Sequence, residues 1–181
     1  MQRPRRDPKW DIFWNGEPAD LLIFLDFDGV VNCQAWYIEV GKEELARRGP
    51  RDDISEALIE RLNDIVEETG AKIVVSSTWR KGEAIEDLQG DLDRHGFRGR
   101  VIGKTPTIPM KVRKEKEEAH EVRGYEITMW LAKHPEFEGT PFIILDDESD
   151  MGPWMSHLVQ TTWKRGLEEE HVAEAIRRLT T

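Results

Sequence analysis

Three pairs of polar side chains follow apolar runs of this sequence, and their types suit phosphate and metal-ion chemistry. They are Asp26 and Asp28, Ser76 and Ser77, and Asp146 and Asp147. Carboxylates that gather at one place repel one another unless a cation neutralises them, and a hard ion such as Mg²⁺ prefers oxygen ligands. A carboxylate beside a bound phosphate can act as a nucleophile while a second carboxyl group protonates the leaving oxygen.

These pairs lie where strands are expected to end. Apolar runs predict strands over 21–27, 71–77, 100–103, 141–147 and 158–162, and helical spacing of apolar residues predicts helices over 53–70, 82–95, 123–134 and 167–179. Uniformly apolar strands that alternate with helices are typical of a parallel sheet covered on both faces, so we expect an α/β fold. Ligands of such sheets bind at the carboxyl ends of the strands, where the polar pairs fall.

The assignment also covers the ends of one helix and one stretch without a regular element. The helix over 53–70 is expected to begin with a capping pair, Asp53 and Glu56, and to end at Gly70. The stretch 33–52 has mixed polarity and is broken by glycine and proline, so no regular element is assigned to it.

Composition places the chain among globular proteins with one main domain. It has 181 residues, of which 38% are hydrophobic and 34% charged, and its net charge of -10 should repel nucleic acid and anionic membranes as a whole. Its single cysteine, Cys33, excludes an intrachain disulfide, and the run 21–25 is too short for a membrane span. We expect a cytoplasmic protein with an irregular arm over 1–20 and one domain over 21–181.

The quoted strings resemble a known superfamily. "LDFDGVVN", "IVVSSTWR" and "IILDDESD" resemble motifs I, II and IV of the haloacid dehalogenase (HAD) phosphotransferases. "SSTWR", "RGYEI..WL" and "LDDESDM" are similar to the HAD domain associated with Swiss Army Knife RNA repair proteins. The resemblance covers residues 21–179 and implies a single Rossmann-like domain that binds Mg²⁺.

The resemblance implies roles for the first two motifs. Asp26 would be the nucleophile and a Mg²⁺ ligand, and Asp28 the general acid/base with its backbone carbonyl on the metal. The hydroxyl that holds the transferring phosphoryl group would be that of Ser77, or of Ser76 if the register differs by one residue.

The later motifs are implied in the same way. Asp146 or Asp147 would complete the metal site, with Asp150 supporting it. The basic residue of motif III would be Arg123, at a position where many relatives have lysine, and Lys104 is the alternative.

Two further residues are candidates for substrate binding. Arg80 could clamp a substrate phosphate through two hydrogen bonds, although a surface position paired with Glu83 or a neighbour is an equal alternative. Trp36, which follows motif I, could stack on a base or could simply pack in the core.

The size of the substrate follows from the expected absence of a large cap domain. The two positions at which relatives carry caps hold only about twenty and about forty residues here, so we expect an open site that suits a nucleic acid end or a protein. The stretch 98–114 contains basic residues and no acid, among them Arg98, Arg100, Lys111, Arg113 and Lys114. It could track a phosphate backbone, or it could be a solvated loop balanced by acids at 115–118.

The leading hypothesis is therefore a Mg²⁺-dependent phosphomonoesterase that works through an aspartyl-phosphate, on nucleic acid ends or nucleotides. The expected partner is a phosphorylated substrate, with no membrane, and the oligomeric state stays open. A small-metabolite phosphatase and a non-catalytic HAD-fold binding module are the alternatives. A phospho-acceptor receiver module is disfavoured because that family carries its phosphorylated aspartate after the third strand.

Overall fold

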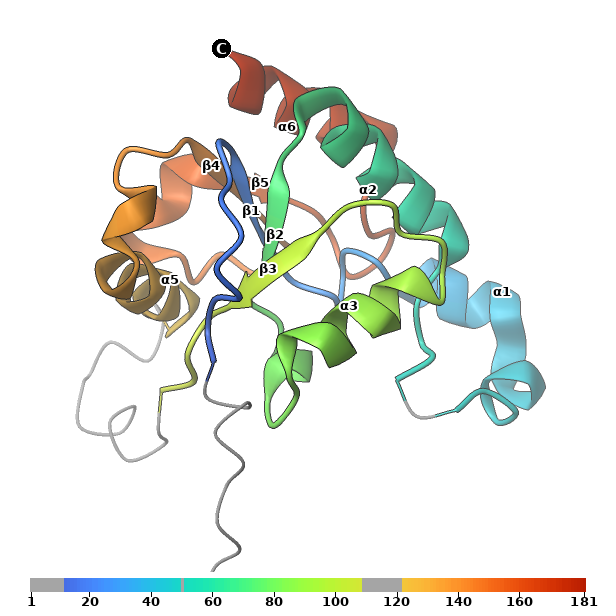
Figure 1. The fold of residues 1–181 in the computed structure, drawn as a ribbon. Coiled ribbons are helices and arrows are strands. Elements are labelled where there is room, and N and C mark those ends of the chain that lie inside the picture. Colours follow the sequence, from blue (N-terminus) through green and yellow to red (C-terminus); the bar gives the residue numbers. More distant parts are fainter. Residues whose placement is uncertain (1–11, 50, 109–121) are drawn as a thin grey trace, which may run out of the picture.

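Five parallel strands form the central sheet of this protein, in the order β3-β2-β1-β4-β5 (Figure 1). The computed structural model describes residues 12–49, 51–108 and 122–181. The strands are β1 (Leu22–Leu25), β2 (Lys72–Val75), β3 (Val101–Lys104), β4 (Phe142–Asp146) and β5 (Leu158–Gln160). The predicted α/β fold is confirmed. Strands β1, β2 and β5 each end two residues earlier than predicted, so the polar pairs after β1 and β2 lie in the turns beyond the sheet.

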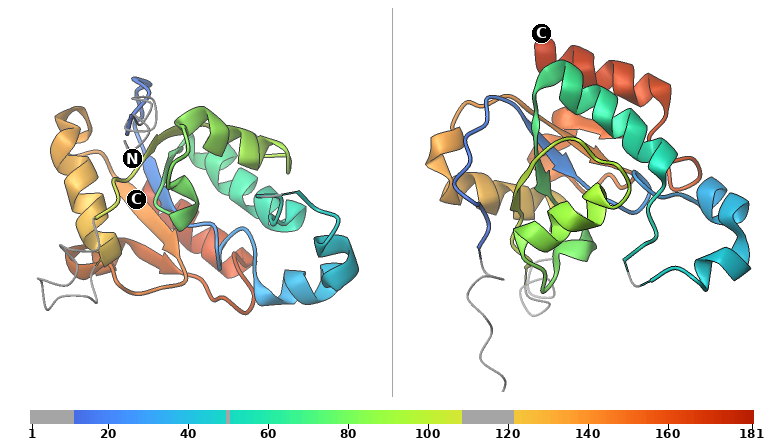
Figure 2. Two further views of the ribbon diagram at one scale, coloured as in Figure 1. Left: turned by 90° about the horizontal axis from the view of Figure 1, so that it is seen from below. Right: turned by 45° about the vertical axis from the view of Figure 1, so that its right-hand side comes forward.

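Helices cover both faces of the sheet. They are α1 (Gln34–Leu45), α2 (Glu56–Thr69), α3 (Ile85–Asp93), α5 (Val122–Lys133) and α6 (Glu169–Thr180), with short 3-10 helices η2 (Thr78–Arg80), η3 (Pro135–Phe137) and η4 (Gly152–His157). Figures 1 and 2 show α2, α3 and α6 on one side of the sheet and α5 on the other. The four predicted helices all form, with ends within three residues of those expected.

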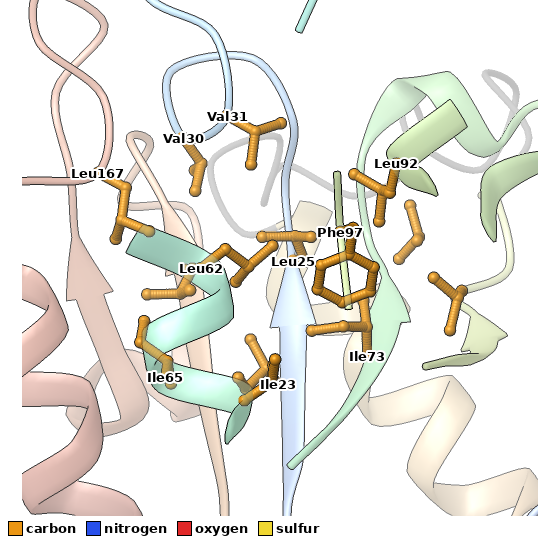
Figure 3. Packing of buried hydrophobic residues seen from close by; sticks show 14 of the residues in the cluster. Ile23, Leu25, Val30, Val31, Leu62, Ile65, Ile73, Leu92, Phe97 and Leu167 are labelled. Atoms are coloured by element: carbon orange, nitrogen blue, oxygen red, sulfur yellow. The ribbon is translucent and has the colours of Figure 1, made fainter. Parts of the chain in front are cut away.

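Successive side chains of each strand point to opposite faces of the sheet and form two hydrophobic layers. Ile23 and Leu25 of β1 point to the layer that α2, α3 and α6 cover, and Figure 3 shows them packed near Leu62 and Ile73. Leu22 and Phe24 point to the opposite layer, which α5 covers. Each fully buried side chain of this size stabilises the fold by roughly 1.5–3 kcal/mol. The strands therefore read as continuous apolar runs because both of their faces are buried.

The capping of α2 differs from the prediction at one end. Ser55, not Asp53, is the N-cap, and its hydroxyl accepts a hydrogen bond from the Leu58 N–H at 3.4 Å. Glu56 is the first helical residue, so the predicted capping pair is wrong by two positions. The other end is confirmed, because Gly70 adopts a left-handed φ of 73° that ends the helix.

Helix α1 occupies the stretch to which no element was assigned. Only Trp36 of this helix is buried, so the apolar periodicity that would reveal it is weak. Gly41 interrupts it with a φ of 76°. Between β1 and α2 the described chain holds this helix and no separate cap domain.

Residues 12–20 lie along the edge of the sheet next to β3. The Asn15 N–H donates to the Ile102 carbonyl at 2.9 Å, and the Lys104 N–H donates to the Phe13 carbonyl at 3.1 Å. Gly103 lacks a side chain where the Phe13 carbonyl approaches. The division at residue 20 stays a prediction, and residues 1–11 lie outside the described part. None of the described helices has the length and apolar character needed to cross a membrane.

Candidate active site

The first acidic residue of the site lies directly after β1, the strand at which the order of the sheet reverses. Asp26 is 4% exposed, and its Oδ1 accepts a hydrogen bond from the Phe27 N–H at 2.8 Å. The chain then turns at Gly29, whose φ is 75°. A side chain at Gly29 would overlap the carboxyl group of Asp147, so glycine is required there for a second reason.

Three carboxylates meet at this edge. Asp26, Asp146 and Asp147 each bring one oxygen within 4.8 Å of the others. They converge because β1 and β4 are parallel neighbours, with Leu25 paired to Leu145. Asp146 Oδ2 is buried and lies 3.1 Å from Arg123 Nε, without a well-aligned hydrogen bond in the described chain. Three carboxylates that share one arginine fit a hard divalent cation such as Mg²⁺.

The electrostatics of these carboxylates agree with a cation site. Burial, and then the negative charge of Asp26, raises the pKa of Asp146 to about 8. The same two causes raise the pKa of Asp147 to about 6. Burial also raises the pKa of Asp26, against the charge of Arg123 and a hydrogen bond from Ser77. Burial and mutual repulsion thus disfavour the ionised forms of these carboxyl groups, and a bound Mg²⁺ would favour them.

Arg123 reaches the carboxylates from the first turn of α5. Its Nη2 lies 3.2 Å from Asp26 Oδ2, its Nε lies 3.1 Å from Asp146 Oδ2, and its Nη1 donates to the Ser76 carbonyl. Burial alone would lower the pKa of Arg123, but the charges of Asp26 and Asp146 outweigh it and raise the pKa. The structure thus brings the predicted motif III residue to the acids.

Asp150 hydrogen-bonds to the backbone of Arg123. Its Oδ2 accepts the backbone N–H of Arg123 at 3.1 Å, which fixes the start of α5 as described. The next residue, Gly124, packs so closely that a side chain there would overlap the Met151 backbone. Asp150 therefore positions the start of the helix that carries Arg123, and its support of the metal site stays a prediction.

Lys104, the alternative basic residue, lies elsewhere. It ends β3, which β2 separates from β1, and its ammonium group donates to the Glu83 carbonyl. It also lies 5.9 Å from the centre of the Phe13 ring. Arg123 is the basic residue that contacts the acids in the described chain.

The two serines after β2 occupy different environments. The Ser77 hydroxyl hydrogen-bonds to Asp26 and also accepts the Trp79 N–H at 3.3 Å. The Ser76 hydroxyl is buried without a partner in the described chain, and its carbonyl receives hydrogen bonds from two arginines. Ser77 is thus the hydroxyl next to the predicted nucleophile.

Asp28 lies beside the acidic group but is not one of its three carboxylates in the described chain. Its carboxylate accepts hydrogen bonds from Asn32 Nδ2 at 2.9 Å and from Trp79 Nε1 at 3.1 and 3.2 Å. Neither donor was predicted. Both lie inside the quoted motifs, but the Trp79 contact joins residues far apart in sequence, which spacing cannot reveal. The backbone carbonyl of Asp28 as a metal ligand stays a prediction.

Arg80 does not have the predicted substrate-clamping role in this structure. Its guanidinium is buried, lies 2.5 Å from Glu126 Oε2, and donates to four backbone carbonyls. These acceptors are the carbonyls of Ser76, Ser77, Thr105 and Pro106. All five N–H donors of the guanidinium are thereby occupied. The surface alternative is also wrong, because Arg80 is 3% exposed and pairs with Glu126, while Glu83 pairs with Arg51.

Trp36 is a packing residue rather than an accessible stacking surface. It is 7% exposed and packs against Cys33 and Leu58, with the Arg48 guanidinium 5.1 Å from its ring centre. The packing alternative for this tryptophan is therefore the correct one.

Two arginines of the basic stretch are paired with acids. Arg98 pairs with Glu60 and Glu67 of α2, and Arg100 pairs with Glu17. The other charges of that hypothesis, at 111–118, lie outside the described residues. The described part gives no support to a phosphate-tracking patch.

Comparison with known proteins identifies the family. Residues 22–172 match the family described as the HAD domain in Swiss Army Knife RNA repair proteins. Neither the curated proteins nor the solved structures contain a match. Membership of a HAD family suggests phosphatase or other hydrolase activity, in agreement with the acids at the carboxyl ends of β1 and β4. The chain therefore belongs to the family of HAD domains in Swiss Army Knife RNA repair proteins.

Proposed function

We propose that this protein is a Mg²⁺-dependent phosphomonoesterase that forms an aspartyl-phosphate on Asp26 and acts on nucleic acid ends or nucleotides. The observation that carries the proposal is the convergence on Asp26 of two further carboxylates, a serine hydroxyl and an arginine. Three carboxylates gathered around one arginine repel one another, and a purely structural ion pair would not require that arrangement.

The side chains divide the chemistry among them. Asp26 attacks the phosphorus, and Arg123 and Ser77 bind the oxygens of the phosphoryl group as their charge develops. A Mg²⁺ ion held by Asp26, Asp146 and Asp147 would neutralise the carboxylates, so that an anionic phosphate can approach them.

Asp28 is placed to move the proton. Its carboxylate belongs to the loop that follows the nucleophile, and the donors Asn32 and Trp79 hold it in one orientation. It protonates the leaving oxygen in the first step and takes a proton from the attacking water in the second. The acid thus returns to its starting state after each turnover.

The substrate class rests on two supports. The segment after β1 forms α1 and no enclosing domain in the described chain, which favours a substrate that need not be enclosed. The family description places the matched domain in RNA repair proteins. Both favour a phosphorylated nucleic acid end or nucleotide over a small metabolite.

The test is phosphate release in the presence of Mg²⁺ from 3′-phosphorylated and 5′-phosphorylated oligonucleotides and from mononucleotides. Asp26→Asn should abolish release, while Asp64→Asn, the same change at an exposed position of α2, should retain it. Release from metabolite phosphates alone would contradict the substrate class. A folded protein that binds Mg²⁺ but releases no phosphate from any ester would contradict the enzyme.

A further inference from the structure

One exposed tryptophan lies beside the loop that carries Asp28. Trp163 is 45% exposed, an unusual state for so large an apolar side chain. It belongs to the turn 162–166 that follows β5, in which the Gly166 N–H donates to the Thr162 carbonyl at 2.8 Å. Because β5 is parallel to β4, this turn lies at the same edge of the sheet as the acids.

Hydrogen bonds attach this turn to the acidic site. Just before it, the Thr161 N–H donates to the Asp146 carbonyl at 3.0 Å, and the Thr161 hydroxyl donates to the Gly29 carbonyl at 2.6 Å. Just after it, the Leu167 N–H donates to the Val30 carbonyl at 3.0 Å, and Figure 3 shows these two side chains near each other. The turn is therefore fixed to the loop that follows Asp28.

The N-terminus of α1 holds the backbone of Trp163 itself. The Gln34 N–H donates to the Trp163 carbonyl at 2.8 Å, and the Ala35 N–H donates to the Lys164 carbonyl at 3.1 Å. The first N–H groups of a helix lack partners within the helix, and here the turn supplies them. The exposed ring thus projects from a backbone that is fixed on both sides.

Three aromatic rings form a row, here called the ladder, that ends in the exposed ring of Trp163. The ring centre of Trp163 lies 5.7 Å from that of Tyr37, which lies 4.9 Å from that of the buried Trp36. Burial, and then the charges of Asp53 and Asp28, raises the pKa of the Tyr37 hydroxyl to about 12. The ladder therefore passes within electrostatic range of Asp28 and ends at the surface in Trp163.

We propose that Trp163 is a stacking platform for the base of the terminal nucleoside, which leaves when its phosphate is cleaved. The inference rests on the proposed function, because Asp28 protonates the leaving oxygen and the leaving nucleoside must therefore lie on the Asp28 side of the site. A flat, exposed indole held rigidly on that side matches a nucleobase and binds any base through its π-face.

The test compares two substrates that differ only in that base. One is an oligonucleotide phosphorylated at the end that the protein cleaves, and the other carries an abasic sugar at the same terminal position. The ratio of kcat/KM between them should fall about tenfold in Trp163→Ala, with the loss in KM, and less in Trp163→Phe. Met155→Ala removes an equally exposed apolar side chain, 44% exposed, and should leave the ratio as in the wild type.

Each outcome decides the matter. Equal losses on both substrates, or no loss on either, would overturn the platform while the phosphatase stands. If no substrate releases phosphate, the proposed function fails, and binding of the two labelled oligonucleotides by fluorescence anisotropy still tests the platform. Trp163→Ala should then weaken binding of the base-bearing strand only, and equal affinities in variant and wild type would refute the inference.

Discussion

Replacing Asp146 by asparagine should stabilise the metal-free protein and remove its response to Mg²⁺. The side chain of Asp146 is fully buried, and burial together with the charge of Asp26 raises its pKa from 3.8 to about 8. Its folded pKa is therefore higher than its unfolded one. Between these two values the folded state binds more protons, so the stability of the metal-free protein falls as pH rises.

The size of the effect follows from the same shift. At pH 7 the unfolded carboxyl group is ionised, about three pH units above its pKa, and each unit corresponds to about 1.4 kcal/mol. The penalty at pH 7 is thus at most about 4 kcal/mol, and we expect Asp146→Asn to recover about 2 kcal/mol of unfolding free energy. The gain should shrink as pH falls and vanish only below about pH 3, where the carboxyl group is protonated in both states.

The assay is urea unfolding in EDTA and in Mg²⁺, at pH 4.5 and pH 8. In EDTA at pH 8 the variant should be more stable than the wild type, and Mg²⁺ should stabilise the wild type alone. Asp64→Asn, on the exposed face of α2, is the control that should change neither quantity. A variant that is less stable than the wild type in EDTA at pH 8, or that Mg²⁺ still stabilises, would refute the reasoning.

Three further substitutions test other parts of the site. Arg123→Gln should lower kcat by about a hundredfold, because the charge that develops on the phosphoryl group loses its cation, whereas Arg123→Lys should retain part of the activity. Initial rates measure the effect, and equal rates in the two variants would contradict the role of the charge. Trp79→Phe keeps an aromatic ring but removes the indole N–H that donates to Asp28, so kcat should fall about tenfold with a changed pH profile. An unaltered profile would exclude the positioning role. Glu126→Gln leaves the buried Arg80 without its counter-charge and should destabilise the fold by about 3 kcal/mol in chemical unfolding, while a loss below about 1 kcal/mol would show that the carbonyls suffice.

Much of the sheet could be predicted from local pattern. Continuous apolar runs are the signature of strands buried on both faces, and they located all five strands. The acids at the ends of β1 and β4 followed from the same pattern together with the resemblance. The weak apolar face of α1 explains why that helix was missed, since only Trp36 of its residues is buried.

The sequence by itself determined the strands, the helices with a strong apolar face and the types of residue that meet at the carboxyl edge. Only the tertiary structure decided which of those residues can contact a substrate. Arg80 and Trp36 have side chains of types that bind substrates. All five hydrogen-bond donors of the Arg80 guanidinium are occupied within the protein, and Trp36 is buried. Trp163 has no motif around it, yet the fold leaves it exposed on a turn that is hydrogen-bonded to the start of α1, in the segment after Asp28. Periodicity depends on neighbours along the chain, whereas burial and hydrogen-bond partners depend on residues that only folding brings together.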